Sequence, residues 1–388
     1  MESKILFEND FYKFFYNHIS YEINNVSPLL ELKRFKLIQN IKKEINSYLS
    51  QKDLKITASH ILPKWVMLQF KNKNYYIDPI FPYNGIDNSQ LKDDLYYLSN
   101  KKLKKDKINK IITELNLTQK FNNAIEELRD FIKSGFYINN IDNFNIKINT
   151  DDDNFQIDIF DNIDFTYKFK INKKIIDKIE KNYILVNSTD DFLTKIISCI
   201  IIRYNTLESY NQQAAVLPEL YQYLGDNYNV DCELFASAFN CFYNNYCSLY
   251  YDIELYCGSK GNFFNMDIIK GFYVANPPFD NTIMKNMALQ LVNSLKKSND
   301  ELSVFITIPD WDKPEYGGFE CLDILKKSGY IQYIEKIHKN RVIFFDYYNN
   351  QHKNLVGVNF ILIQNKNGKK KHAIAKDLKK ILLQFFPK

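Results

Sequence analysis

The stretch Gly271-Phe272-Tyr273-Val274-Ala275-Asn276-Pro277-Pro278-Phe279 joins a run of apolar residues to a tetrapeptide that contains two prolines. The first five residues favour a strand, because aromatic and β-branched side chains are enriched in strands. Residues 280–297 follow, and their apolar side chains recur at the spacing of one helix face: Ile283, Met287, Leu291 and Leu295. The sequence therefore predicts that residues 276–279 form the turn between a strand and an amphipathic helix.

The same alternation continues through the carboxy-terminal half of the chain. Further strands are predicted at residues 231–235, 263–264, 304–308 and 356–363, and further helices at 241–249 and 320–327. Strands that alternate with helices predict a mostly parallel sheet with helices on both faces. Ligands of such sheets bind beyond the carboxyl ends of the strands, so we expect residues 276–279 to face a ligand.

The amino-terminal half has a different pattern. Helices are predicted at residues 29–49, after the cap Ser27-Pro28, and at 91–133, with a short strand or irregular lobe at 65–82 between them. Alternation around Phe144 and Phe155 predicts two strands joined by a hairpin turn at Asp151-Asp152-Asp153-Asn154. Helices follow at 175–181 and 191–207. We therefore divide the chain into a mainly helical domain at 1–185, with a small β insertion around 136–172, and an α/β domain at 186–388.

Composition sets limits on function. The chain has 388 residues and a net charge of +5, which permits nucleic-acid binding without requiring it. It contains only 11 glycines, which argues against a Gly-rich phosphate loop. The run Lys101-Lys102-Leu103-Lys104-Lys105 is either a solvated helix face or a contact to an RNA backbone.

The cysteines and the apolar segments indicate a reduced, intracellular and soluble protein, in the nucleus or the cytoplasm. The 6 cysteines form no CxxC pair, so we expect no metal site. No apolar core of a signal peptide follows Met1. The apolar run at residues 196–202 is far shorter than the ~20 residues that span a bilayer, so no membrane contact is expected.

The tetrapeptide suits chemistry on the exocyclic amine of adenine, although a Pro-Pro pair alone is also typical of a rigid turn. That amine is a weak nucleophile, because its lone pair is delocalised into the ring. The Asn276 side-chain carbonyl and the Pro277 backbone carbonyl can each accept one amino hydrogen, and the prolines hold these acceptors in place. Phe279 would stack on the extruded base. We predict methyl transfer from S-adenosylmethionine, with four catalytic residues: Asn276, Pro277, Pro278 and Phe279.

The cofactor is expected at the turn after the strand at 231–235. This turn, Ala236-Ser237-Ala238-Phe239-Asn240, has small side chains that let a backbone approach a ligand, although it lacks the usual glycines. Asp252, near the next predicted element, would bind the cofactor ribose or lie in a surface turn. The predicted cofactor-binding residues are Glu233, Phe235, Ala236, Ser237, Asn240 and Asp252.

Several motifs recur in a fixed order over about residues 190–365. They are Ile202-Arg203-Tyr204 with Gln213-Ala214-Ala215; Cys232-Glu233-Leu234-Phe235-Ala236-Ser237 with Asn240-Cys241; Tyr246-Cys247-Ser248, Asp252 and Gly258-Ser259-Lys260-Gly261; Asn276-Pro277-Pro278-Phe279; and Ile308-Pro309-Asp310-Trp311. Together they resemble the cap-specific adenosine-N6 methyltransferases, the family of phosphorylated CTD-interacting factor 1.

The resemblance implies a Rossmann-like class I S-adenosylmethionine-dependent methyltransferase domain at residues 186–388, preceded by the helical domain, which would bind RNA. The implied reaction is N6-methylation of the cap-adjacent (2'-O-methyl)adenosine of mRNA. The implied partner is capped mRNA that begins with adenosine, and further partners would come from the capping or transcription machinery. The substrate-binding residues implied by the resemblance are Arg203, Gln213, Ser259, Trp311 and His352.

The chain also departs from the family pattern. Ala238-Phe239 stands where the family usually has Pro-Leu, and residues 346–352 keep Gln351-His352 without a preceding Arg. A WW module is not expected, since Trp65 and Trp311 lie far apart, so binding to the polymerase tail through such a module is not expected either.

Two other functions stay open. One is an adenine-N6 methyltransferase that acts on other RNA or on DNA, and the second is a catalytically silent cap- or RNA-binding subunit with the same fold. Two residues also have structural alternatives to substrate binding: Arg203 could form a helix salt bridge, and Trp311 could lie in the core.

Overall fold

The computed structural model describes residues 20–22, 26–69, 75–83, 87–135, 145–151, 154–161, 165–183, 190–208, 212–311 and 320–387. Contacts divide the chain into two units. The helical unit comprises residues 19–177 and 188–211, and the sheet unit holds residues 178–187 and those from 212 onwards. The boundary predicted from the sequence, after residue 185, would assign α8 (Asp190–Thr206) to the second domain. The contacts instead assign α8 to the helical unit, where it packs against α1 (Pro28–Gln51).

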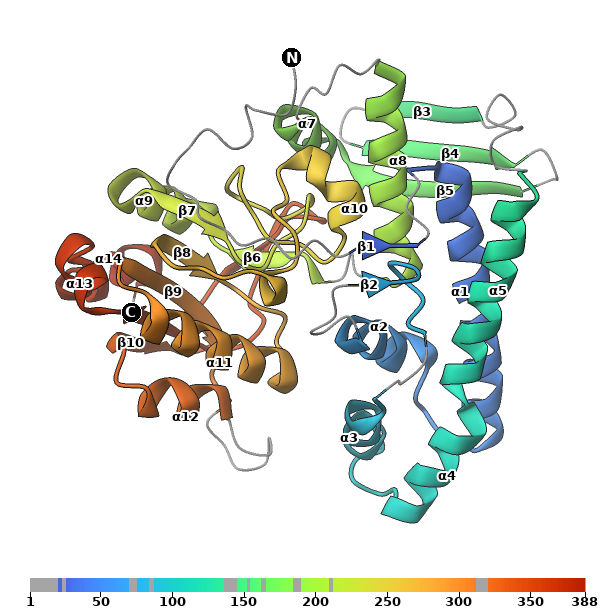
Figure 1. The fold of residues 1–388 in the computed structure, drawn as a ribbon, viewed down its shortest axis with the longest axis horizontal. Coiled ribbons are helices and arrows are strands. Elements are labelled where there is room, and N and C mark those ends of the chain that lie inside the picture. Colours follow the sequence, from blue (N-terminus) through green and yellow to red (C-terminus); the bar gives the residue numbers. More distant parts are fainter. Residues whose placement is uncertain are drawn as a thin grey trace. The chain divides into compact units, whose positions relative to one another are not determined.

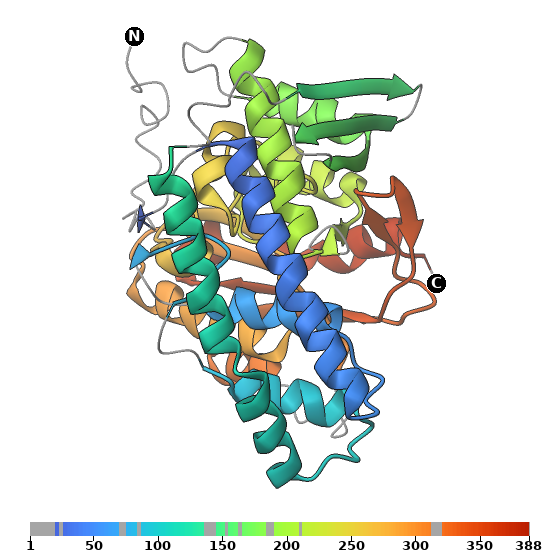
Figure 2. The ribbon, with the colours of Figure 1, turned by 90° about the vertical axis from the view of Figure 1, so that its right-hand side faces the viewer.

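Long helices dominate the helical unit. Proline is tolerated in a first helical turn, and α1 begins at Pro28. Leu30, Ile38 and Ile45 of α1 are fully buried, and α8 lies alongside this helix (Figure 2). Trp65, predicted in an irregular lobe, instead lies inside α2. The remaining elements of this region are α2 (Ala58–Gln69), α3 (Ser89–Leu98), α4 (Lys105–Leu115), α5 (Leu117–Lys133), β1 (Ser20–Tyr21) and β2 (Tyr75–Tyr76).

A small antiparallel sheet completes this unit. It has the order β3–β4–β5, with the strands β3 (Asn145–Asp151), β4 (Asn154–Asp161) and β5 (Phe165–Asn172). The pairing of Asp151 with Asn154 confirms the predicted hairpin. Phe144 and the turn residues Asp152 and Asp153 lie outside the described residues. The next helix, α7 (Lys173–Asn182), was also predicted.

The sheet unit is built on five strands in the order β10–β13–β9–β8–β7. The pairs β7–β8 and β8–β9 are parallel, whereas β13 is antiparallel to both of its neighbours. The sheet is therefore mixed: β7, β8, β9 and β10 run in the same direction, as the prediction of a mostly parallel sheet expects, and β13 runs in the opposite direction between β9 and β10. The chain leaves β10, passes through β11 (Phe344–Asp346) and β12 (Gln351–Lys353), and returns between β9 and β10 in the opposite direction. The five strands are β7 (Val230–Glu233), β8 (Gly271–Ala275), β9 (Leu302–Pro309), β10 (Ile331–Ile337) and β13 (Val358–Gln364).

Helices cover both faces of this sheet, as predicted (Figure 1). Successive side chains of a strand point to opposite faces, and along β8 Tyr273 belongs to one buried cluster while Phe272 and Val274 belong to the other. The first cluster includes residues of α11 (Asn281–Lys297) and α12 (Glu320–Lys327). The second includes residues of α9 (Pro218–Tyr228) and α14 (Leu378–Phe385). A short helix, α13 (Lys366–Lys371), follows β13, and a second small sheet has the order β12–β11–β6, with β6 at Ala214–Val216.

Two predicted elements of this unit are wrong. Residues 241–249 do not form a helix, because Glu233 exchanges backbone hydrogen bonds with them: its amide donates to the Asn245 carbonyl, and its carbonyl accepts from the Cys247 amide. The residues predicted as a strand at 263–264 lie in a short 3-10 turn, Phe263–Asn265, because the Asn262 side chain accepts a hydrogen bond from the Phe264 amide.

Candidate active site

Three parallel strands end at the same edge of the sheet. β7 ends at Glu233, β8 at Ala275 and β9 at Pro309. The turn after β7, the tetrapeptide after β8, and Asp310 and Trp311 after β9 therefore gather at this edge, which we call the carboxyl edge. Ligands of α/β sheets bind at such an edge.

The tetrapeptide is held by hydrogen bonds at its carboxyl end, and its first residue carries a buried acceptor without a partner among the described residues. Asp280 caps α11, since its Oδ1 accepts hydrogen bonds from the amides of Thr282 at 2.9 Å and Ile283 at 3.0 Å. The Asp280 amide in turn donates to the Pro278 carbonyl at 2.7 Å. By contrast, the side-chain Oδ1 of Asn276 is buried and has no hydrogen-bond partner within the described chain. An unsatisfied buried acceptor costs about 1–3 kcal/mol, and a donor on a ligand would remove that cost.

Phe279 links the ends of two strands. Its ring centre lies 6.4 Å from that of Trp311, at an interplanar angle of 77°, and 6.0 Å from that of Phe344, at 73°. The ring is partly buried and packs against both clusters of the sheet unit. Trp311 is likewise partly buried, and its side chain packs against the first cluster without belonging to the fully buried core.

The Glu233 carboxylate is the second buried group with an unused acceptor. Its Oε2 accepts a hydrogen bond from the Phe242 amide at 2.9 Å, while its Oε1 is buried without a partner among the described residues. Burial raises the pKa of Glu233 to about 7, although backbone hydrogen bonds and the charge of Lys178 oppose this rise. This group therefore changes its charge near neutral pH.

The turn after β7 is tied together by side chains. The Ser237 hydroxyl donates to Gln213 Oε1 at 2.6 Å, and the Ser237 amide donates to Asn240 Oδ1 at 2.8 Å. The structure thus brings Gln213, which the resemblance assigned to the substrate, together with two residues assigned to the cofactor. The Ala236 amide donates to the Cys247 carbonyl at 2.9 Å, so backbone contacts also fix this turn.

Phe235 and Ser259 lie in the same region. The Phe235 ring centre is 5.2 Å from that of Phe263, in an aromatic group next to the turn. The Ser259 hydroxyl is hydrogen-bonded to the Ser248 hydroxyl at 2.7 Å. Isolated bridges connect Glu233 to Tyr246 and Tyr246 to Ser259, so the pairing of the sheet continues past β7.

Sequence reasoning missed Lys178 of α7. Its Nζ donates to the Phe239 carbonyl at 2.7 Å and lies 4.5 Å from the centre of the Tyr347 ring. Burial lowers the pKa of Lys178. This lysine therefore fixes the end of the turn after β7 through a contact that is distant in the sequence, and no local pattern signals it.

Asp252 and His352 are two further residues that the sequence predicts for the site. Asp252 is buried in α10 (Tyr251–Glu254) rather than in a surface turn. His352 is exposed on β12, and its ring centre lies 5.4 Å from that of Phe345.

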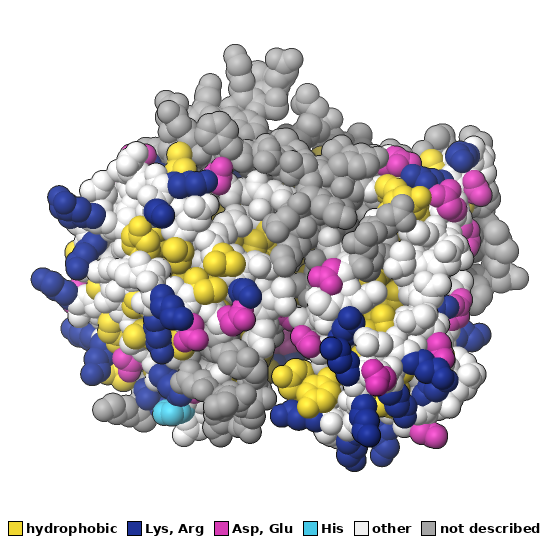
Figure 3. All heavy atoms as spheres, turned by 60° about the horizontal axis from the view of Figure 1, so that its bottom comes forward, with side chains coloured by type: hydrophobic (Ala, Val, Ile, Leu, Met, Phe, Trp, Pro, Cys, Tyr) yellow, Lys and Arg dark blue, Asp and Glu magenta, His cyan; other side chains and the backbone are white. Residues whose placement is uncertain are grey.

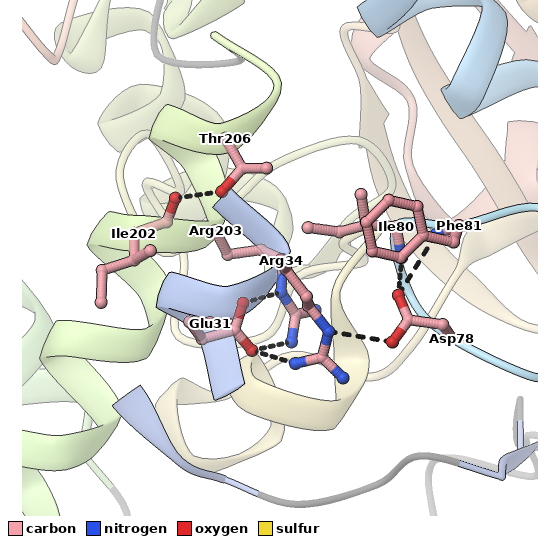
Figure 4. A network of polar contacts seen from close by, with 8 residues as sticks. All are labelled: Glu31, Arg34, Asp78, Ile80, Phe81, Ile202, Arg203 and Thr206. Atoms are coloured by element: carbon pink, nitrogen blue, oxygen red, sulfur yellow. Dashed lines mark hydrogen bonds and ion pairs between the residues drawn. The ribbon is translucent and has the colours of Figure 1, made fainter. Parts of the chain in front are cut away.

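Arg203 belongs to a buried ion cluster in the helical unit (Figure 4). Its Nε donates to Glu31 Oε2 at 2.7 Å, and Arg34 Nε donates to Asp78 Oδ2 at 2.9 Å. Burial favours the neutral form of Glu31, but the two guanidinium groups outweigh it and keep the pKa of Glu31 below its usual value. Arg203 and Glu31 are fully buried, which supports the helix salt bridge as the role of Arg203.

Within the described ranges, no group of three His, Cys, Asp or Glu side chains is placed to hold a metal ion. All six cysteines are buried free thiols. In that part of the chain, no helix has the length and apolar character needed to cross a membrane.

The chain is similar to a known family and to known proteins, and the part that matches the family model contains the carboxyl edge. Residues 174–347 match the sequence model of the family described as phosphorylated CTD interacting factor 1 WW domain. The mouse and human proteins named mRNA (2'-O-methyladenosine-N(6)-)-methyltransferase are each 30% identical to this chain over 122 residues. The aligned part covers 30% of this chain and 17% of each relative. These matches confirm the family resemblance, whereas the expected lack of a WW module stays a prediction.

Proposed function

Because residues 174–347 match the sequence model of the family of phosphorylated CTD interacting factor 1, we propose that this protein methylates N6 of adenosine in RNA. The methyl donor in this proposal is S-adenosylmethionine. The carboxyl edge of the sheet unit is the proposed active site, and the whole unit is proposed to be a Rossmann-like class I methyltransferase domain.

One observation carries the proposal: a buried, unpartnered Oδ1 on Asn276, directly after a parallel strand. Adenine N6 bears two hydrogens, and Asn276 Oδ1 and the Pro277 carbonyl would each accept one of them. Both acceptors are fixed before the substrate arrives, because Asp280 and the two prolines hold the turn. The nitrogen gains positive character as it attacks the methyl group, and preorganised carbonyl dipoles stabilise that charge.

The residues after β7 fit a cofactor with hydrogen-bond donors. S-adenosylmethionine carries an amino group and ribose hydroxyls, and it supplies an electrophilic methyl group. Glu233 Oε1 is an unused buried acceptor for such a donor. Ser237 and Asn240 hydrogen-bond to each other, so we propose that they stabilise the conformation of the turn. The proposed cofactor site is completed by Phe235, Ala236 and Asp252.

Phe279 is proposed to hold the adenine ring by stacking. Adenine fits the acceptor pair better than guanine does, because guanine presents a carbonyl at the equivalent position and that carbonyl would face two others. This argument concerns the base only. The preference for a cap-adjacent adenosine comes from the names of the mouse and human relatives, so capped mRNA that begins with adenosine is the proposed substrate.

The test is methyl transfer from labelled S-adenosylmethionine to three RNAs of otherwise equal sequence. They are a capped RNA that begins with adenosine, the same RNA without its cap, and a capped RNA that begins with guanosine. We expect transfer to the first only. Equal rates with and without a cap would favour a general adenine methyltransferase, and no transfer despite cofactor binding measured by calorimetry would favour a silent RNA-binding subunit.

A further inference from the structure

The end of α3 exposes two tyrosines and a leucine. Tyr96, Tyr97 and Leu98 of α3 are 39%, 46% and 43% exposed. The two tyrosine rings lie 5.5 Å apart, centre to centre, at an interplanar angle of 70°. The rings meet edge to face, so the edge of one ring covers part of a face of the other, and the Lys101 Nζ lies 5.8 Å from the centre of the Tyr97 ring. The exposed fractions show that both residues still present surface to solvent, on which a base can stack.

Four lysines follow Tyr96 and Tyr97 closely in the sequence, at the turn between α3 and α4 and at the start of α4. Lys101, Lys102, Lys104 and Lys105 are all exposed, and none of them forms an ion pair with another described residue. Other lysines of the helical unit do form such pairs, for example Lys33 with Glu127 and Lys52 with Glu114. On the face shown in Figure 3, basic and hydrophobic side chains lie next to one another over this part of the helical unit. These four positive charges are therefore available to an external anion.

The turn that carries the lysines is rigid. The Ser99 hydroxyl donates to the Tyr96 carbonyl at 2.8 Å and accepts from the Leu103 amide at 3.3 Å. Leu103 is buried, so it anchors the middle of the lysine run. Lys101 has a φ of 61° and follows Asn100 with a φ of 56°, which is a conformation that L residues adopt rarely. A fixed turn binds a ligand with little loss of conformational entropy.

The start of α4 adds to the positive potential. Lys104 occupies the N-cap position and no side chain caps the helix there, so the first amides of α4 point outwards with the positive end of the helix dipole. Asp106 in the first turn offsets part of this charge. The four lysines still outnumber it, and a nucleic-acid backbone presents several phosphates that such a group of charges can neutralise.

We propose that this face binds single-stranded RNA, with bases stacked on Tyr96 and Tyr97 and phosphates bound by Lys101, Lys102, Lys104 and Lys105. Aromatic platforms beside positive charge are the common means of holding a single strand without reading its sequence. The choice of RNA rests on the proposed function, but the binding itself does not require methyl transfer. We call these six residues the α3–α4 face.

The test measures binding of a fluorescein-labelled, uncapped single-stranded RNA to the full chain by fluorescence anisotropy. Stacking is worth about 1–3 kcal/mol per base, so Tyr96→Ala with Tyr97→Ala should weaken binding about tenfold or more. The matched pair Tyr96→Phe with Tyr97→Phe keeps the rings and should bind like the wild type. Since Tyr96 and Tyr97 are exposed, both variants should keep the wild-type melting temperature.

The lysines are tested through salt dependence. Replacing all four by Gln should reduce the slope of log K against log salt by about 3, because each phosphate contact to a single strand contributes about 0.7. The control replaces four exposed lysines of the sheet unit by Gln, Lys326, Lys327, Lys379 and Lys380, and should leave most of the slope intact.

Two results would overturn the proposal: no RNA binding by the wild type, or an equal loss of binding in the control. Its failure is distinguishable from failure of the proposed function. Unchanged binding in the α3–α4 variants, together with methyl transfer by the wild type, refutes only the α3–α4 face. RNA binding that depends on this face, without any methyl transfer, refutes only the enzyme.

Discussion

Two regions of this chain bury polar side chains, and they differ in whether those side chains are satisfied. In the helical unit, Arg203 and Glu31 are fully buried and bonded to each other. At the carboxyl edge of the sheet unit, Glu233 Oε1 and Asn276 Oδ1 are buried without a partner among the described residues. Because an unsatisfied polar atom is costly, a ligand that supplies the missing contacts would be favoured at the carboxyl edge.

The comparison separates residues that hold the fold from residues that await a ligand. Arg203 and Asn276 both lie in motifs that resemble the same family, so the resemblance alone gave them similar weight. Their surroundings give them different roles. Arg203 is proposed to stabilise the helical unit, and Asn276 is proposed to contact the substrate.

The largest expected effect is a loss of stability on breaking the ion cluster. Arg203→Leu leaves Glu31 buried without one of its two guanidinium partners, and removing one partner of a buried pair costs about 3–5 kcal/mol. The free energy of unfolding from urea denaturation measures this loss. Arg129→Leu is the matched control, since Arg129 forms its ion pairs with Glu22 and Glu126 at the surface, where such pairs are worth about 1 kcal/mol or less. Equal losses in the two variants would contradict the comparison.

The second prediction concerns Glu233 and pH. Between the ordinary glutamate pKa of 4.5 and the folded pKa of about 7, the folded chain keeps a proton on Glu233 that the unfolded chain has released. Raising the pH through this window therefore favours the unfolded state, by up to about 3 kcal/mol from this group. Glu233→Gln should remove that part of the pH dependence, so the variant should lose less stability than the wild type between pH 5 and about pH 8. Parallel stability profiles for the two proteins would rule out a raised pKa at Glu233.

The smallest of these effects is expected at Phe279. Stacking is worth about 1–3 kcal/mol per base, so Phe279→Ala should raise the RNA KM and lower turnover with little change in the affinity for S-adenosylmethionine. The ring also packs against Trp311 and Phe344. Phe279→Leu restores bulk without an aromatic face and should keep the kinetic defect while recovering stability. Recovery of activity in Phe279→Leu would show that the residue packs the fold only.

The sequence predicts the elements whose patterns are local. The strand at Gly271–Ala275 and the helix Asn281–Lys297 follow from apolar periodicity and from the Asp280 cap. The antiparallel insertion of β13 depends on pairing between segments that are distant in the sequence. The periodicity of apolar residues does not indicate the direction of a strand. The same holds for residues 241–249, where hydrogen bonds to Glu233 override a helical pattern.

The candidate site divides in the same way. Asn276 could be predicted because a strand, a turn and a helix follow one another directly around it. Lys178 could not, since it reaches the Phe239 carbonyl 61 positions away in the sequence. Arg203 shows the converse, because its partner Glu31 lies 172 positions away and only the structure reveals that the two are bonded.

The most direct test of the central claim compares two properties of one variant, Asn276→Ala. Removing the preorganised acceptor should lower methyl transfer to capped, adenosine-initiated RNA by about a hundredfold or more, on the order of 3 kcal/mol. Calorimetry should show the same affinity for S-adenosylmethionine as the wild type, and Asn227→Ala on the exposed face of α9 should leave both properties unchanged. If Asn276→Ala retains more than about a tenth of the wild-type rate, the Asn276 side chain is not the acceptor that prepares the adenine amine for transfer.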